Sequence, residues 1–417
     1  MRYRAENFDV WQYLCGMTYE PMIRLRIDFG GMIDEERLKR AVTKSMGTIP
    51  MMGCCFEGEG RKPYWVDKGF SGEDMVRVRE VGTDAEAEIL DAYASRIDVG
   101  AEPQLKMNIV RTPDGDTLCA VLSHLVCDAT GFKQYVHLVA DIYTALAQGE
   151  QPPTPHRYPR RTKPLYTNTG FWERMKILRS PEPAHDYALA DQPGIDFHGS
   201  EQDTYMEYRT LSTGEFASLR GFAKAHGGTL NDALMALFAR AYCRETGTDH
   251  IAFTSTIDWR RYIPPEVPYG ITNYAGNCSC GIPVKPGESL EATLARITQQ
   301  MSVYKTGKLP LQSALAWDWA MRVFPYSLVK SKFTTAAPMA RVSFTNLGIL
   351  DPDKWDFDGL PIRTASMTAS IKPRPYLQLT ASTFDGTCTL SCNIDGSEQE
   401  RTFVDRMLDD IVRDASG

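Results

Sequence analysis

A histidine and an aspartate stand four residues apart where a long apolar run ends. The segment AVLSHLVCDATGF covers residues 120–132; His124 follows the run directly, and Asp128 and Gly131 come after it. A buried strand holds the residue at its end rigidly, and such strand ends often line crevices that bind ligands. An imidazole there can exchange a proton with a substrate near neutral pH. The segment therefore suggests a general base, with an ordinary buried polar histidine as the alternative.

Asp128 has three possible roles. Asp, Thr and Gly occur together where a turn enters a helix. His124, Cys127 and Asp128 are also all metal-ligand types, but no second cluster of His or Cys lies nearby in the sequence, so no metal site is predicted. We favour a carboxylate that pairs with an arginine and fixes the loop carrying His124. Deleting one partner of such a buried pair costs roughly 3 to 5 kcal/mol.

The first half of the chain alternates between strand and helix patterns. In residues 22–29, MIRLRIDF, every second residue is apolar, which indicates a half-buried strand. Asp34 can cap a following helix, a second helix is expected over 84–97, and a third runs from Phe132 to near Gly149. Further strands are predicted over residues 51–56, 64–67, 75–81, 104–111 and 117–123.

A proline-rich segment separates this half from a second one with the same pattern. Residues 150–164 carry five prolines and four basic residues and begin a connector that reaches to about residue 203. Ser212 and Glu215 form a capping box, and another helix should run from Thr229 to about Glu245. Strands are predicted over 205–211, 250–257, 277–284, 340–346, 376–383 and 388–394, and helices over 288–305, 311–330 and the C-terminal residues around Met407.

These patterns predict a mixed α/β (α+β) fold in two halves of comparable size. The predicted domains are residues 1–165 and 204–417, with residues 166–203 as the connector. A length of 417 residues is too great for one hydrophobic core, which agrees with two or three domains.

Composition narrows the choice of partners. The net charge of -7 disfavours binding to nucleic acid. No run approaches the roughly 18 apolar residues of a membrane span, and charges interrupt the first apolar residues before a signal-peptide core can form, so we expect a cytoplasmic protein. The ten cysteines are scattered without a Cys-x-x-Cys pair, which favours reduced, packed side chains.

Several segments resemble the chloramphenicol acetyltransferase-like superfamily, which includes peptide-synthetase condensation domains, alcohol acetyltransferases and polyketide-associated acyltransferases. SHLVCDATG, at 123–131, resembles the His-His-x-x-x-Asp-Gly motif of that superfamily. The order and spacing of the other similar segments extend the resemblance over nearly the whole chain. These segments are residues 24–56, TLNDALMALFARAYCRETG at 229–247, DWRRYIPP at 258–265, NYAGNCSCGIPV at 273–284 and VSFTNLG at 342–348.

The resemblance implies two acetyltransferase-like domains arranged as a V-shaped pseudodimer with a tunnel between them. His124 matches the catalytic second histidine, and Asp128 matches the structural aspartate, for which Arg260 is the candidate ion-pair partner. Thr345 and Asn346 would approach the tunnel from the other domain and could donate a hydrogen bond to an oxyanion. Their alternative role is that of a polar strand end before a glycine turn.

The implied activity is the transfer of an acyl group from acyl-CoA to the hydroxyl or amine of a small acceptor. No permanently bound cofactor is expected, and the donor thioester belongs to CoA or to the phosphopantetheine of an acyl carrier protein. We favour CoA because no fused carrier or adenylation motif is present. Six basic residues are candidates for CoA phosphates, although solvated loop charges are the favoured interpretation of all of them: Arg157, Arg160, Arg161, Lys163, Lys372 and Arg374.

Two departures from the motif leave other functions open. Ser123 replaces the first histidine, and Ala129 follows Asp128 where the superfamily usually has glycine. A free-standing condensation enzyme that uses carrier-bound substrates is one alternative. A non-catalytic binding module with the same fold is the other, and the retention of His124 and Asp128 argues against it.

Overall fold

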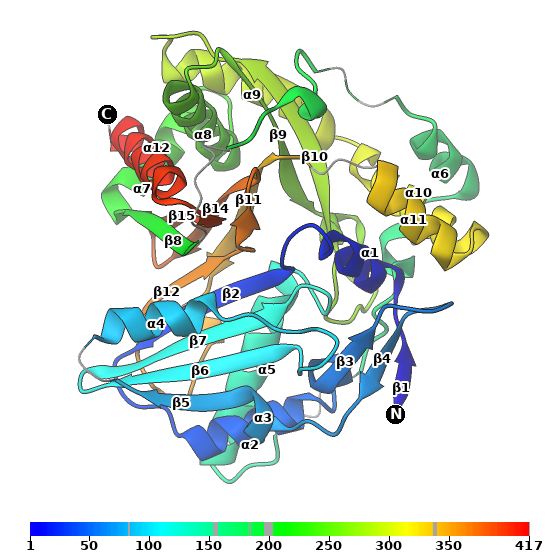
Figure 1. Ribbon diagram of the computed structural model, residues 1–417, viewed down its shortest axis with the longest axis vertical. Helices are drawn as coiled ribbons and strands as arrows, with labels where there is room; N and C mark the ends of the chain where they lie inside the picture. The colour runs from blue at the N-terminus through cyan, green and yellow to red at the C-terminus, as the bar shows by residue number, and fades with distance from the viewer. Residues whose placement is uncertain are drawn as a thin grey trace.

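The protein forms two lobes, one above the other in Figure 1. The computed structural model describes residues 1–81, 84–152, 157–181, 183, 185–195, 203–336 and 340–416. Within these ranges the strands form sheets of three, five and seven strands. The mixed α/β architecture in two halves agrees with the prediction from the sequence.

The first lobe is built on the five-stranded sheet, in the order β12-β2-β7-β6-β5. Its inner strand β7 is buried along its whole length, as the apolar run predicts. Leu118, Ala120 and Leu122 belong to the main core, whereas Cys119 packs with Val110 and Ile89 in a separate cluster. The strands are β2 (Met22–Phe29), β5 (Val76–Glu80), β6 (Leu105–Thr112), β7 (Gly115–Ser123) and β12 (Ile362–Thr368).

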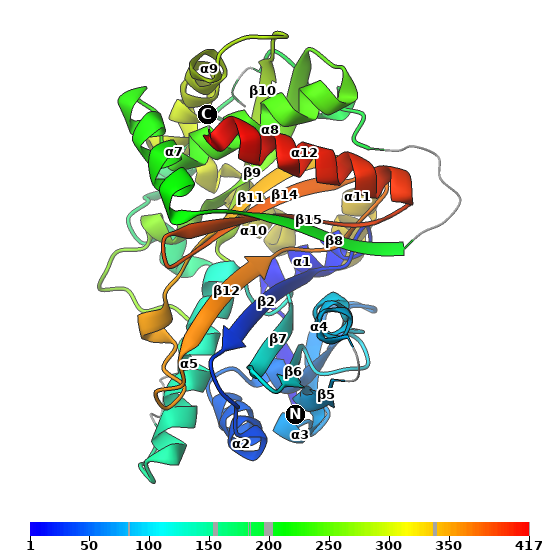
Figure 2. The ribbon, with the colours of Figure 1, turned by 90° about the vertical axis from the view of Figure 1, so that its left-hand side faces the viewer.

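Helices cover this sheet, as Figure 2 shows. They are α2 (Glu35–Ser45), α3 (Gly72–Met75), α4 (Ala85–Ala94) and α5 (Ala129–Ala147). Asp34 caps α2 as predicted, because its side chain accepts a hydrogen bond from the amide of Arg37. A small sheet of β1 (Arg2–Arg4), β4 (Tyr64–Asp67) and β3 (Cys54–Glu57) lies beside the lobe. The strand predicted from residue 51 begins only at Cys54, because Pro50–Gly53 form a 3₁₀ helix.

The second lobe is built on the seven-stranded sheet. The capping box predicted from Ser212 and Glu215 is present at the start of α7. The strands are β8 (Asp203–Leu211), β9 (His250–Asp258), β10 (Ala275–Pro283), β11 (Val342–Leu350), β13 (Lys372–Pro373), β14 (Leu377–Phe384) and β15 (Thr387–Gly396). The helices are α7 (Thr213–Ala225), α8 (Leu230–Thr246), α9 (Leu290–Lys305) and α12 (Glu398–Ser416).

A strand from the second half of the chain joins the sheet of the first lobe. β12 pairs antiparallel with β2, and Met367 lies opposite Leu25. β12 was not predicted because its segment, IRTASMT, is mostly polar, and only its C-terminal part is buried. The domain boundaries at residues 165 and 204 remain a prediction. Through β12, residues 362–368 of the predicted second domain belong to the sheet of the first lobe.

Helices at the side of the molecule pack around the junction of the lobes (Figure 1). These are α1 (Asn7–Cys15), α6 (Phe171–Leu178), α10 (Gln312–Val323) and α11 (Tyr326–Ala336). Trp11 meets Trp317 and Phe333 edge-on, with ring centroids 4.9 and 5.2 Å apart. The single helix predicted over 311–330 was wrong, because Pro325 lacks an amide donor and restricts the residue before it.

All ten cysteines are buried and carry free thiols, in agreement with their predicted packing. Across the described ranges, no helix has the length and apolar character needed to cross a membrane.

Candidate active site

A cavity of about 400 Å³ lies where the two lobes meet. Small-molecule pockets usually measure roughly 300 to 1,000 Å³, so this one has room for a substrate. Its lining comes from α1, the end of β7 and strands β9, β10 and β11. The five candidate residues from the sequence all belong to that lining: His124, Asp128, Arg260, Thr345 and Asn346.

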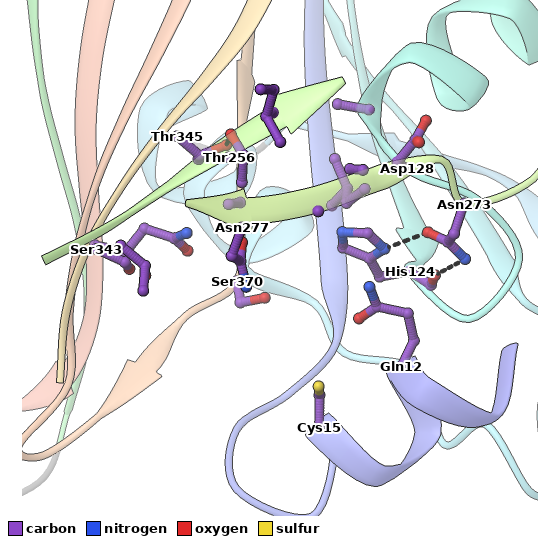
Figure 3. Close-up of a pocket in the computed structure, with 18 of the residues that line it drawn as sticks. Gln12, Cys15, His124, Asp128, Thr256, Asn273, Asn277, Ser343, Thr345 and Ser370 are labelled. Carbon is purple, nitrogen blue, oxygen red and sulfur yellow. Dashed lines mark hydrogen bonds between the residues drawn. The ribbon is translucent and has the colours of Figure 1, made fainter. Parts of the chain in front are cut away.

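His124 follows the last residue of β7 and is held at both its backbone and its ring. Its amide donates to the carbonyl of Pro21 at 2.7 Å. Its Nδ1 lies 2.9 Å from Oδ1 of Asn273 (Figure 3). The side chain of Asn273 is itself fixed, since Nδ2 donates to the carbonyls of His124 at 2.9 Å and Leu125 at 3.3 Å.

This arrangement decides which ring nitrogen carries the proton. Because Nδ2 of Asn273 serves as the donor, Oδ1 must face the ring and accept from Nδ1–H of His124. The neutral ring then keeps an unprotonated Nε2, on the side of the ring away from Asn273 in Figure 3. An unprotonated nitrogen at a cavity wall is what a general base requires.

Burial lowers the pKa of His124 below its usual value, although the carboxylate of Asp128 and the hydrogen bond to Asn273 oppose that effect. The ring is therefore neutral at pH 7 and able to accept a proton.

Asp128 and Arg260 form a buried, two-pronged ion pair. Nη1 and Nη2 of Arg260 each donate to one carboxylate oxygen, both at 2.9 Å. The side chains are 9% and 5% exposed, respectively, for Arg260 and Asp128. Burial acts to raise the pKa of Asp128, but Arg260 and the amides of Gly131 and Tyr274 outweigh it, so the pKa of Asp128 lies below its usual value.

Asp128 also begins α5, so two of its proposed roles coincide. Its Oδ1 accepts from the amide of Gly131 at 2.9 Å, as an N-cap does. A Cβ on Gly131 would lie 2.7 Å from Cβ of Cys127, so the first turn of α5 needs a glycine there. The carboxylate is occupied by Arg260, and among the described residues no group of three or more His, Cys, Asp or Glu is placed to hold a metal ion.

The two departures from the motif have modest structural effects. Ser123 is fully buried, and its hydroxyl accepts a long hydrogen bond from the amide of Leu125, so it stabilises the turn below His124. Ala129 lines the cavity next to Asp128. Neither residue displaces the imidazole from the cavity.

Thr345 and Asn346 approach the cavity from β11, on the second lobe. Oγ1 of Thr345 lies 2.8 Å from Oγ1 of Thr256. Nδ2 of Asn346 donates to Asn231 at 3.3 Å, and its Oδ1 accepts from Gly348. The structure thus brings these two residues to the same cavity as His124.

The expectation of solvated loop charges was wrong for three of the six basic residues. The side chain of Arg160 is only 8% exposed and pairs with Asp9 at 2.8 Å. Lys372 is 5% exposed and lines the cavity, and Arg374 lies 3.6 Å from buried Glu400. The other three are exposed: Arg157, Arg161 and Lys163.

Asn273 belongs to the site but was not predicted from the sequence. It lies within one of the segments similar to the superfamily but had no role, because 149 residues separate it from His124. No local pattern in the sequence marks such a contact.

The sequence matches a known protein family. The family model described as Condensation domain matches residues 22–311. The chain belongs to the condensation domain family. The predicted resemblance is thereby confirmed.

In two curated relatives the matching region is a small part of a much longer synthetase. The chain is 24% identical to surfactin synthase subunit 1 of Bacillus subtilis (strain 168) over 192 residues, which are 43% of this chain and 5% of that protein. It is 21% identical to the nonribosomal peptide synthetase kk1B of Curvularia clavata over 291 residues, 65% of this chain and 2% of that protein. The chain therefore spans only a small fraction of either relative.

Solved structures share the fold over nearly the whole length of this condensation-family chain. The first condensation domain of the CDA synthetase has a TM-score of 0.70 and 14% identity, covering 100% of this chain and 96% of that one. The TRI3 trichothecene 15-O-acetyltransferase from Fusarium sporotrichioides has a TM-score of 0.69 and 12% identity, covering 99% of this chain and 95% of that one. Polyketide synthase associated protein 5 from Mycobacterium tuberculosis has a TM-score of 0.66 and 16% identity, covering 99% of this chain and 97% of that one.

Proposed function

We propose that this condensation-family protein is an acyltransferase that moves an acyl group from acyl-CoA to the hydroxyl or amine of a small acceptor. The observation that carries the proposal is the ring of His124, held by Asn273 with its unprotonated Nε2 free at a cavity of substrate size. Condensation domains and an acetyltransferase share the fold, which supports acyl transfer as the class of reaction.

In the proposed reaction, Nε2 of His124 removes the proton from the acceptor's O–H or N–H group as that atom attacks the thioester carbonyl. The attack forms the new C–O or C–N bond and a tetrahedral oxyanion. The carbon–sulfur bond then breaks, and the protonated imidazole returns its proton to the leaving thiolate. The products are an ester or amide and a free thiol, so protons and charge balance.

Thr345 and Asn346 are the proposed donors to the oxyanion. The hydroxyls of Thr345 and Thr256 share one hydrogen bond, which leaves one of the two O–H groups free to donate. One of the two Nδ2 hydrogens of Asn346 is used by Asn231, and the other is free for the substrate. Donors aimed at the developing charge stabilise the transition state more than the substrate.

A carrier-bound donor is the second candidate, favoured by the two synthetase relatives. The donors are distinguished by offering the same acyl group on CoA, on free pantetheine and on an acyl carrier protein. Faster transfer from CoA supports our proposal, and transfer from the carrier alone supports the condensation enzyme.

The test of the activity is release of free thiol when the purified protein is mixed with acyl-CoA and a panel of alcohols and amines. Thiol release that depends on an acceptor, together with formation of the matching ester or amide, supports acyl transfer. A protein that binds these compounds and turns over none of them is the non-catalytic module.

The pH dependence of kcat/KM should show the lowered pKa of His124. The base works only when neutral, so activity is expected to be constant around pH 7 and to fall as the pH drops through a value below 6.5. A profile measured with acyl-CoA between about pH 4.5 and 8 checks this expectation. An acidic limb centred above 6.5 would contradict it.

Replacing Asn273 with aspartate tests how the ring is positioned. A carboxylate against Nδ1 should favour the protonated ring and move the acidic limb of kcat/KM upward by about one pH unit or more. Asn273→Ala should lower kcat without that movement, because the ring loses its orientation. If both variants keep the wild-type profile and kcat, Asn273 does not position the base.

A further inference from the structure

A lysine is buried in the wall of the cavity and makes no ion pair with the residues that the structure describes. Lys372 stands on the short edge strand β13, and only 5% of it is exposed. It belongs to the lining of the same cavity as His124. Its Nζ forms no hydrogen bond or ion pair with the residues that the structure describes, and it lies over the ring of Tyr19, 3.1 Å from the centroid.

The groups around this amine leave its charge unmatched. Cys15 hydrogen-bonds to Tyr19, and burial raises the pKa of both, so both are neutral at pH 7. The carboxylate of Glu20 acts on Lys372 through space and raises its pKa, but no ion pair joins the two side chains. Oε1 of Glu20 accepts from Arg24 at 2.6 Å and from the amide of Ile371 at 2.7 Å, whereas its buried Oε2 has no hydrogen-bond partner. A buried cation without a partner is costly, so a site that keeps one is a candidate for an anionic ligand.

The other cation of the cavity cannot take that role. Apart from His124, which is neutral at pH 7, the basic residues of the described lining are Arg260 and Lys372, and Arg260 is bound to Asp128 and Asp258. One free ammonium suits one negative charge, which fits a carboxylate better than the several charges of a CoA phosphate group.

The amine lies at the reacting end of the cavity. Tyr19 stands two residues before Pro21, whose carbonyl holds the backbone of His124. The positive charge of Lys372 is also one of the influences that lower the pKa of His124. An anion bound by Lys372 would therefore lie on the part of the substrate near the bond that forms.

We propose that Lys372 binds a carboxylate carried by the acceptor or by the acyl chain, so that the cavity selects a substrate with one anionic group near its reacting end. The identity of the two substrates rests on the proposed acyl transfer, whereas the anion site itself does not.

Burial lowers the pKa of Lys372 to about 7, so much of the free amine is uncharged just above neutrality. A bound carboxylate favours the charged form, and binding at about pH 8 should therefore take up protons. Calorimetry in two buffers of different ionisation enthalpy measures that uptake.

The experiment uses probes in matched pairs. Small hydroxy acids and amino acids are each compared with their amides, and succinyl-CoA and glutaryl-CoA with the neutral acyl-CoAs of the same length. Calorimetry is run on the wild type, on Lys372→Met and on Lys285→Met, an exposed control. Because Lys372→Met removes a buried amine, that variant should melt no lower than the wild type.

We expect the wild type to bind at least one acid about tenfold or more tightly than its neutral partner, with proton uptake. Lys372→Met should lose that preference, and Lys285→Met should keep it. The proposal is overturned if no acid is preferred, if the preference survives in Lys372→Met, or if that variant weakens binding of free CoA instead.

The experiments distinguish failure of the anion-site proposal from failure of the proposed acyl transfer. His124→Ala should keep the preference in binding while losing turnover. A wild type that prefers acids but releases no thiol contradicts acyl transfer and supports the anion site. A wild type that turns over neutral substrates and shows no preference for acids supports acyl transfer and contradicts the anion site.

Discussion

Replacing His124 with alanine should lower kcat for acyl transfer by roughly 10²- to 10⁴-fold, the usual contribution of a general base. Pro21 holds the backbone of His124, and Asn273 holds its ring with a free Nε2; the variant leaves no equivalent base in place. Asp128 cannot substitute, because Arg260 occupies its carboxylate and its pKa is lowered. Thiol release with a saturating acceptor measures the loss.

His137→Ala is the matched control for this variant. His137 lies on α5, 13 positions beyond His124, with 45% of its side chain exposed and Asp141 at 3.4 Å. It should retain wild-type turnover, and circular dichroism should show that both variants fold. The KM for the donor is expected to change little in His124→Ala, because the base acts on the transition state. Undiminished turnover in that variant would show that another group accepts the proton.

Local patterns were enough to predict the elements that hold the base. The apolar run of β7 and the Asp, Thr and Gly that follow predict a buried strand that leads into a helix, and this is where His124 and Asp128 stand. The capping of α2 and α7 was equally readable, because a cap depends on residues three positions apart. The pairing of Arg260 with Asp128 was predicted from the resemblance alone, because no residue near Arg260 in the sequence indicates Asp128 as its partner.

Contacts between segments that are distant in the sequence could not be predicted from local patterns. Asn273 meets His124 across 149 residues, and β12 joins the first lobe although its own sequence is largely polar. Lys372 lies in a proline-rich segment that reads as a solvated loop, yet the walls supplied by Tyr19 and Cys15 bury it. Burial of such a charge depends on what folds over it, which no short window of sequence contains.

Replacing Arg260 with methionine should lower the free energy of unfolding by roughly 3 to 5 kcal/mol at pH 7. The variant leaves the buried carboxylate of Asp128 with only the amides of Gly131 and Tyr274 as partners. Urea denaturation measures the loss. Arg261→Met is the control: Arg261 is exposed and donates to the carbonyls of Tyr304 and Lys305, so its replacement should cost no more than about 1 kcal/mol.

Acid should narrow the gap between the wild type and Arg260→Met. In the wild type the pKa of Asp128 is lowered, so its contribution to stability is present above the ordinary value and lost as the pH falls through the lowered one. In the variant, burial without Arg260 raises that pKa, so protonation relieves the penalty at a higher pH. A gap that stays constant from about pH 7 to 4.5 would show that the lost stability comes from packing.

The double variant Asp128→Asn with Arg260→Met separates the pair from its surroundings. Removing both charges leaves no uncompensated ion, so the double variant should lose less stability than the two single variants summed. The side-chain oxygen of the asparagine introduced by Asp128→Asn can still accept from the amide of Gly131 and so keep the cap of α5. Strict additivity of the single losses would mean that Asp128 and Arg260 act independently, against the two 2.9 Å hydrogen bonds that join them.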